Sequence, residues 1–184
     1  AKASIWILSG TDFEHALILG ATHVGGLDPA TIDRNINDSL ELTVSLAKKY
    51  NLGIDIHLHD SDTLGAYEIH TLLDIIEEHD FKNEVTISHA FALAGIFDQQ
   101  FDDLVARLKK HQVKITTSIA IGASPITLPI FDLDEQGIDV YLGHDSITDH
   151  WSPFGTMNTI QTLHLIVQRF GLIDEYHISQ TLKF

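Results

Sequence analysis

The chain has 184 residues, of which 44% are hydrophobic and 20% are charged, and its formal net charge is −15. This composition is typical of a globular domain with enough apolar side chains for a core, and the negative charge argues against a nucleic-acid partner. Cysteine is absent, which excludes disulfides, thiolate metal sites and cysteine nucleophiles, so a bound metal ion would need nitrogen and oxygen ligands.

Membrane segments and targeting signals are not predicted. No run approaches the roughly eighteen consecutive apolar residues that a membrane helix needs. The N-terminal stretch AKASIWILSG is too short and too weakly basic for a signal peptide. We therefore expect a cytoplasmic protein that has no membrane partner and acts on a small neutral or cationic molecule.

Short runs rich in valine and isoleucine alternate with helical patterns along the chain. Apolar residues recur at i, i+3, i+4 and i+7 in residues 69–76 and 101–108, and residues 157–170 form a further predicted helix. Such alternation predicts parallel strands that are covered by helices. The strand-like runs are residues 4–8, 22–27, 53–58, 84–88, 113–119 and 138–142.

The segment SLELTVSLA, residues 39–47, fits two structures. Its apolar and polar residues alternate as in a half-buried strand, whereas Ile36, Leu40, Val44 and Ala47 have helical spacing. We predict a helix, because leucine, glutamate, alanine and lysine favour one and because a helix preserves the alternation of strands and helices.

The ends of the predicted strands recur at regular intervals. Asp28, His57, His89, Ala120 and Asp145 mark units of about 30 residues, as in a (βα)8 TIM barrel, whose active site lies at the C-terminal ends of its strands. Six strands are two fewer than a closed barrel needs, and an open arc has two unpaired edges. Two alternatives remain: an open doubly wound sheet, or one partial barrel domain over residues 1–184 that lacks its first two strands.

Histidines and aspartates gather at these strand ends. His57 and His59 are two residues apart, so on a strand both would face the same side, and His89 and the pair His144 and Asp145 each follow a further apolar run. Three strand ends converging on one face would surround one volume with imidazoles and a carboxylate, as a divalent-metal hydrolase needs. The competing interpretation is a set of solvated strand ends with incidental histidines.

The segments GATHVGG, GIDIHLHDSD, VTISHA and LGHDSITDHWSPFGTMN, in this order and spacing, resemble the bacterial cytosine deaminase group of the amidohydrolase superfamily. The resemblance implies a TIM barrel that holds one divalent metal ion, zinc or iron, with His57 and Asp145 as ligands from strands 5 and 8. It also implies that His89 faces the metal-bound water and that Asp60 carries protons to the substrate ring. The six predicted strands would then be strands 3 to 8.

A second register would make GIDIHLH the His-x-His metal pair of strand 1. It would leave only three further strands before Asp145, although the resemblance places that ligand at the end of strand 8. We therefore favour the strand 5 register, in which His59 is a neighbour of the site rather than a ligand. The strand 1 pair would then lie upstream of Ala1.

The activity that the resemblance implies is hydrolytic deamination of a small nitrogen heterocycle. In it, Asp145 helps to remove a proton from water, Asp60 protonates a ring nitrogen and His89 steadies the tetrahedral intermediate. Ser146 and Trp151 are expected to contact the substrate, but Ser146 stands where cytosine deaminases carry a second aspartate, so cytosine itself is not predicted. Two alternatives stay open: hydrolysis of a cyclic amide or another ring substituent by the same metal site, and a catalytically silent barrel fragment that forms a homo-oligomer.

Overall fold

The computed structural model describes residues 4–6, 15, 17–119, 126–145, 147–148 and 155–184, which are built around one sheet of six strands. Each strand runs parallel to its neighbours. All six predicted strands are confirmed, although residues 7 and 8 of the first run lie outside the described part of the chain. The strands are β1 (Ser4–Trp6), β2 (His23–Leu27), β3 (Gly53–His57), β4 (Val85–Ser88), β5 (Lys114–Thr117) and β6 (Val140–Leu142).

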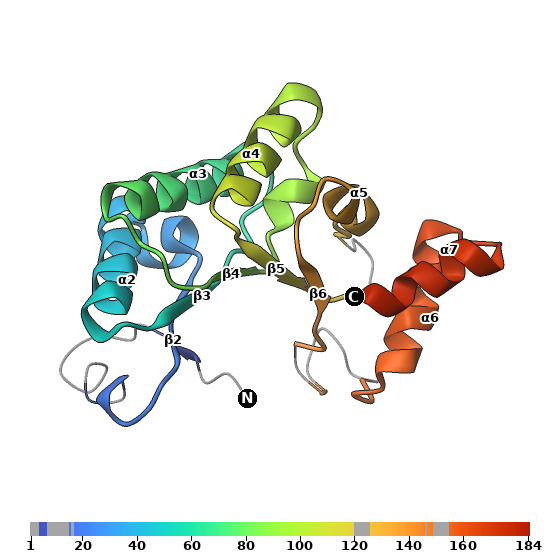
Figure 1. The fold of residues 1–184 in the computed structure, drawn as a ribbon, viewed down its shortest axis with the longest axis horizontal. Helices are drawn as coiled ribbons and strands as arrows, with labels where there is room; N and C mark the ends of the chain where they lie inside the picture. The colour runs from blue at the N-terminus through green and yellow to red at the C-terminus, as the bar shows by residue number, and fades with distance from the viewer. Residues whose placement is uncertain (1–3, 7–14, 16, 120–125, 146, 149–154) are drawn as a thin grey trace.

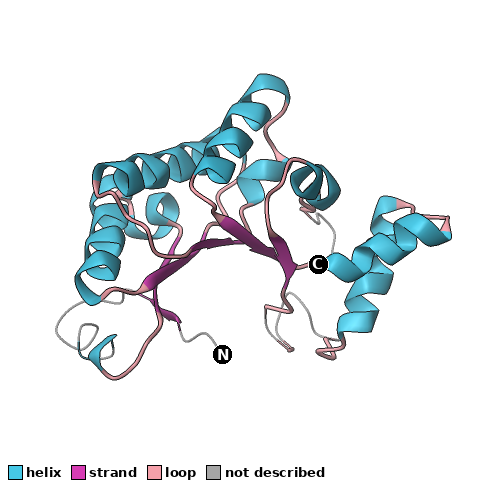
Figure 2. Ribbon diagram, viewed as in Figure 1, coloured by secondary structure: helices cyan, strands magenta, loops and turns pink. Residues whose placement is uncertain are grey.

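The strand order decides between the two predicted sheet types. A doubly wound sheet reverses its order at a switch point, whereas this sheet runs from β1 to β6 in chain order. Figures 1 and 2 show the sheet curving into an arc with a layer of helices on its convex side. The doubly wound alternative is therefore wrong, and the fold is that of a partial TIM barrel. The helices on the convex side are α2 (Ile36–Tyr50), α3 (Asp62–Glu78), α4 (Asp98–Lys110) and α5 (Ile130–Glu135).

The ambiguous segment lies within α2, which confirms the predicted helix. Leu40, Val44 and Ala47 are fully buried at helical spacing. The helix is capped at both ends: the Asn35 side chain accepts the backbone N–H of Asp38, and Asn51 ends the helix in the left-handed conformation. These caps and the buried stripe explain why the helix forms in spite of the alternating pattern.

The packing of β3 decides which way its polar side chains point. Ile54 and Ile56 are fully buried and belong to the same apolar cluster as Leu72 of α3. Because side chains alternate along a strand, Asp55 and His57 point to the opposite, concave face of the sheet. The apolar residues of β3 therefore hold His57 on the inner side of the arc, where a barrel has its active site.

Shorter helices complete the described chain. Helix α6 (Thr159–Phe170) confirms the helix predicted in residues 157–170. Helix α5 and the later α7 have six residues each, too few to show a helical period in the sequence. Within the described ranges, no helix is both long and apolar enough to span a bilayer. The remaining short helices are η1 (Pro29–Asp33) after β2, η2 (Phe91–Ala94) after β4, α7 (Glu175–Gln180) and η3 (Thr181–Lys183).

Candidate metal and catalytic site

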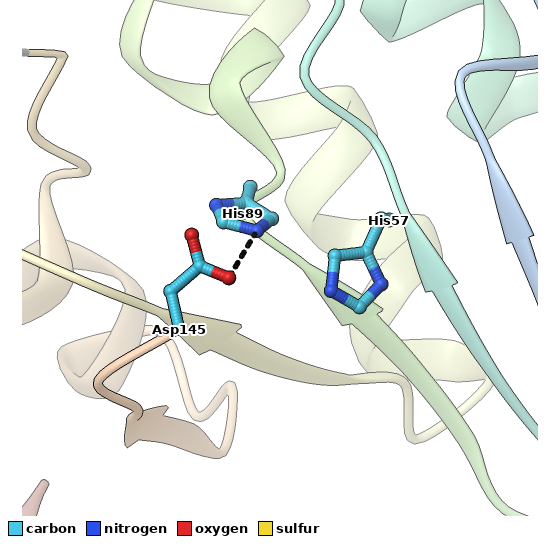
Figure 3. A group of neighbouring side chains, drawn as sticks. All are labelled: His57, His89 and Asp145. Carbon is cyan, nitrogen blue, oxygen red and sulfur yellow. Dashed lines mark ion pairs between the residues drawn. The ribbon is translucent and has the colours of Figure 1, made fainter. Parts of the chain in front are cut away.

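Three side chains from three strand ends meet on the concave side of the sheet. His57 is the last residue of β3, His89 follows β4, and Asp145 follows β6. Each offers one ligand atom, and these atoms all lie within 4.8 Å of one another. Figure 3 shows the two imidazoles and the carboxylate facing a common space, with His89 Nε2 lying 3.9 Å from Asp145 Oδ1. The convergence expected from the sequence therefore occurs for His57, His89 and Asp145.

The backbone adopts the left-handed conformation directly after two strands of the sheet and shortly after a third. Asp28, His89 and Asp145 follow β2, β4 and β6, and they have φ values of 40°, 69° and 63°. Left-handed backbone is uncommon for residues other than glycine and costs about 1–3 kcal/mol for each residue. Left-handed residues also occur in turns elsewhere in the described chain, and those at the three strand ends are of the kind that clusters at functional sites.

The surroundings of the two imidazoles favour the neutral form that binds a metal ion. Burial lowers the pKa of His57 and lowers the pKa of His89 to about 4. A metal binds the neutral imidazole, so neither histidine has to lose a proton near pH 7. His89 Nδ1 is also buried and has no hydrogen-bond partner among the described residues. Nitrogen and carboxylate donors fit zinc or ferrous iron, so the residues present fit the expected ion.

A dyad that the sequence did not predict lies next to this group. Asp28 accepts the backbone N–H of His59 at 2.6 Å, and its second oxygen lies 2.9 Å from His59 Nδ1. This hydrogen bond raises the pKa of His59. The ring of His59 lies 4.1 Å from that of His89, centroid to centroid. His59 is therefore held in place by Asp28 and packs against His89, although it is not one of the three converging groups.

The other predicted site residues lie apart from the three converging groups or outside the described chain. Asp60 lies in the loop after β3, where its Oδ2 accepts the hydroxyl of Thr31 at 3.2 Å. His144 is half-buried beside Asp145 and is not part of the group. Ser146 and Trp151 lie outside the described residues, so their contact with substrate stays a prediction. The roles of His57, His89, Asp145 and Asp60 stay predictions in the same way.

Gly65 allows α3 to begin directly against the Asp60 backbone. A Cβ at residue 65 would overlap the carbonyl oxygen of Asp60 and would come within 3.0 Å of the Ala92 Cβ. In an ordinary helix interior, alanine would be favoured over glycine by about 1 kcal/mol. Here the overlap is with backbone, so the clash outweighs that preference and Gly65 fixes the position of Asp60.

We expect Gly65→Ala to lower the free energy of unfolding by about 1–3 kcal/mol. It should also lower turnover of the full-length enzyme by up to about a hundredfold, because it displaces Asp60, the residue predicted to transfer a proton. Urea denaturation and steady-state kinetics would measure the two effects. Glu78→Ala, an exposed residue of the same helix, is the matched control and should change neither. A Gly65→Ala protein that is more stable and equally active would contradict the packing described above.

A model of the amidohydrolase family matches residues 14–182 of the chain. An N-isopropylammelide isopropyl amidohydrolase of Pseudomonas sp. (strain ADP) is 36% identical over 157 residues, which cover 85% of this chain and 38% of that protein. The crystal structure of an N-isopropylammelide isopropylaminohydrolase from Burkholderia multivorans superimposes with a TM-score of 0.88 and 27% identity, over 99% of this chain and 48% of that one. A 5-methylcytosine deaminase from Klebsiella pneumoniae is similar in fold, with a TM-score of 0.81 and 21% identity, over 100% of this chain and 50% of that one. The chain spans half or less of the length of each.

Proposed function

The chain belongs to the amidohydrolase family, and on this premise we propose that it carries part of the active site of a hydrolase that cleaves an exocyclic C–N bond of a small nitrogen heterocycle. The observation that carries the proposal is the convergence of His57, His89 and Asp145 at the C-terminal ends of parallel strands. We further propose that one divalent ion, zinc or iron, is held by His57 and Asp145 together with ligands from outside residues 1–184. When bound, such an ion supplies Lewis-acid activation of a water molecule.

The residues of this chain then divide the proton transfers between them. Asp60 takes up a proton from the attacking water, which Asp145 helps to remove, as the water oxygen adds to the ring carbon that bears the leaving group. Asp60 delivers this proton to the neighbouring ring nitrogen, so that the ring can accept the electrons of the new bond. As the exocyclic C–N bond breaks, the remaining hydroxyl proton of the adduct passes through Asp145 to the leaving nitrogen, which departs as ammonia or an alkylamine. His89, kept neutral by burial, can donate one hydrogen bond to the oxygen of the tetrahedral adduct.

The Asp28–His59 dyad supports the placement of His89 in this scheme. His59 Nδ1 is held by the Asp28 carboxylate, so its ring cannot turn freely, and it packs against one side of the His89 ring. Phe91 lies 5.3 Å from the His89 ring, centroid to centroid, in an edge-on arrangement. His89 is therefore packed against two rings, which also contact each other, and this packing supplies the preorganisation that a hydrogen-bond donor to a developing charge needs.

Two leaving groups fit the same site. Ammonia would leave in a deamination, as the resemblance to cytosine deaminases implies. An alkylamine would leave if the enzyme acts as the names of the two isopropylammelide hydrolases suggest, and these relatives are 36% and 27% identical to this chain. Their identity favours a substituted amino group on a triazine as the second candidate. In both reactions the bond that breaks joins a ring carbon to an exocyclic nitrogen, and water supplies the new ring oxygen.

Release of amine by the full-length enzyme, loaded with zinc or ferrous iron, would test the proposal. Amino-substituted and alkylamino-substituted pyrimidines, triazines, pterins and purines should be screened for both ammonia and alkylamine. We expect turnover of at least one class, with loss of activity on treatment with a chelator and recovery on adding metal. Absence of any amine release from all four classes would count against the function.

We expect Asp60→Asn to lower turnover of the active substrate by about a hundredfold to ten-thousandfold, the range typical of general acid–base groups. Asp60→Glu should retain activity to within about tenfold, because it keeps the carboxylate. The cytosine deaminase group that the sequence resembles usually has glutamate at this position. Steady-state kinetics would measure both. Asp102→Asn, an exposed residue of α4, is the matched control. Equal activity of Asp60→Asn and the wild type would remove Asp60 from the mechanism.

A further inference from the structure

Helix α3 contains a buried glutamate, Glu68, that has no role in the mechanism described above. Glu68 has no exposed surface. Its Oε1 accepts the backbone N–H of Ala30, in η1, at 2.8 Å. Its Oε2 is also buried and has no hydrogen-bond partner among the residues that the structure describes. A buried carboxyl oxygen without a hydrogen bond lowers the stability of the fold, so this oxygen should have either a hydrogen-bond donor or a proton of its own.

The charges around Glu68 are negative. Asp60, from the loop after β3, and Asp28, directly before η1, both act against ionisation of Glu68. Charged groups of the neighbouring helices contact other residues of α3 or its C-cap. Glu41 of α2 bonds to His79. Arg107 of α4 bonds to His70 and Asp74. Helix η2, which also packs on α3, consists of apolar residues only. Glu68 therefore meets carboxylates where a buried carboxylate would need a cation.

These surroundings favour the protonated form of Glu68. Burial, with the charges of Asp60 and Asp28, raises the pKa of Glu68 to about 7. A protonated carboxyl group has one O–H donor and one carbonyl acceptor. Because Oε1 is the acceptor for Ala30, the proton belongs on Oε2, the oxygen without a partner. Asp60 is the neighbouring acceptor: Ala30 and Thr31, adjacent in the chain, bond to Glu68 and to Asp60 Oδ2 respectively, and a hydrogen bond between the two carboxyl groups contributes to the raised pKa of Glu68.

We propose that Glu68 is the positioning residue of Asp60: its protonated carboxyl group donates a hydrogen bond from Oε2 to the Asp60 carboxylate and thereby holds that carboxylate oriented for its proton transfer. This inference rests on the proposed function of Asp60. The proton of Glu68 stays on Glu68 throughout, while Asp60 takes up and releases the proton that passes from water to the substrate. When Glu68 ionises, the donor is lost and two carboxylates repel each other, so Asp60 loses its orientation.

The first test compares Glu68→Gln with Glu68→Leu in the full-length enzyme. Glutamine keeps both a donor and an acceptor but cannot ionise, whereas leucine keeps neither. We expect wild-type kcat to fall as pH rises above about 7. Glu68→Gln should keep kcat at pH 6 within about threefold of wild type and move the falling limb upward by more than one pH unit. Glu68→Leu should lower kcat at pH 6 tenfold or more and change KM less than threefold.

The matched control is Glu78→Gln, an exposed residue of the same helix, which should leave the pH profile unchanged. The proposal is overturned if the profile of Glu68→Gln superimposes on that of the wild type. It is also overturned if glutamine and leucine reduce kcat to the same extent, because Glu68 would then contribute packing or charge and no hydrogen bond to Asp60.

A second measurement does not depend on finding a substrate. The folded protein holds the Glu68 proton between pH 4.5 and about 7, where the unfolded chain has lost it. Stability should therefore fall as pH rises through this window, and the ratio of the unfolding constants of wild type and Glu68→Gln should rise by up to about tenfold per pH unit. This dependence should shrink when Asp60 is replaced by asparagine, because one of the neighbouring charges is removed.

The two measurements separate the two proposals. If no heterocycle is hydrolysed but the Asp60→Asn replacement reduces the pH dependence, the proposed function fails and the coupling between Glu68 and Asp60 stands. If the pH dependence is the same with asparagine at residue 60, the bond between the two carboxyl groups is refuted, whatever the enzyme hydrolyses.

Discussion

Replacing His57 by alanine is expected to lower turnover of the full-length enzyme by about a thousandfold or more. His57 is the proposed metal ligand that β3 places on the concave face. Among the described residues, only His89 also has a ring nitrogen that converges with His57 and Asp145. Lewis-acid stabilisation by a metal ion is worth several kcal/mol, and each 1.36 kcal/mol corresponds to a factor of ten in rate. Steady-state kinetics together with metal analysis of the purified variant would measure the effect.

The matched control for this experiment is His164→Ala. His164 is exposed on α6 and contributes neither to the core nor to the converging group. It should keep both the metal content and the turnover of the wild type. If His57→Ala keeps wild-type turnover, the site has been assigned to the wrong histidine.

Residues 1–184 alone are expected to bind zinc weakly and to be inactive, whereas a protein extended upstream by a strand carrying a His-x-His pair should bind one zinc or iron ion tightly. Structural zinc sites with four ligands contribute about 10–16 kcal/mol. Two of the four ligands would contribute about 5–8 kcal/mol of binding free energy, which corresponds to a Kd between roughly 1 µM and 0.2 mM. Titration calorimetry on residues 1–184, with folding checked by circular dichroism, would measure this affinity.

Two variants test whether Asp145 contributes to this metal binding. Asp145→Asn should weaken the remaining binding further, while His177→Ala, an exposed residue of α7, should leave it unchanged. Tight stoichiometric metal in residues 1–184 would contradict the strand 5 register, because it would mean that His57 and Asp145 already have enough ligands within this segment. The same result would support the register in which GIDIHLH is the His-x-His pair of strand 1.

The sequence predicted most of the fold because its signals are local. Each predicted strand is a short apolar run, and the buried stripe of α4, Leu104, Val105 and Leu108, follows the helical period that the sequence shows. The short helices α5 and α7 were not predicted, because six residues are too few to show a helical period in the sequence. The sequence also left open whether the sheet is doubly wound or an arc of a barrel, because local patterns carry no information about strand order.

The site was predicted in part. His57, His89 and Asp145 stand at strand ends, and strand ends of a parallel sheet lie at one edge, so their convergence could be expected. Asp28 also ends a strand, at the same interval of about 30 residues as the others. That spacing was the signal for its role, but only the fold shows that its carboxylate reaches His59. Glu68 gave no signal, because a glutamate in an amphipathic helix is usually exposed.

The sequence by itself therefore determined the parallel strand and helix units, the family resemblance and the residues that end the strands. These depend on interactions within about ten residues along the chain, through side-chain periodicity and capping. The tertiary structure alone decided the strand order, the neutral state of His57 and His89, the dyad of Asp28 with His59 and the buried carboxyl group of Glu68. Each of these depends on what packs against a side chain from about 30 or more residues away, and burial and charge at that distance cannot be read from a linear pattern.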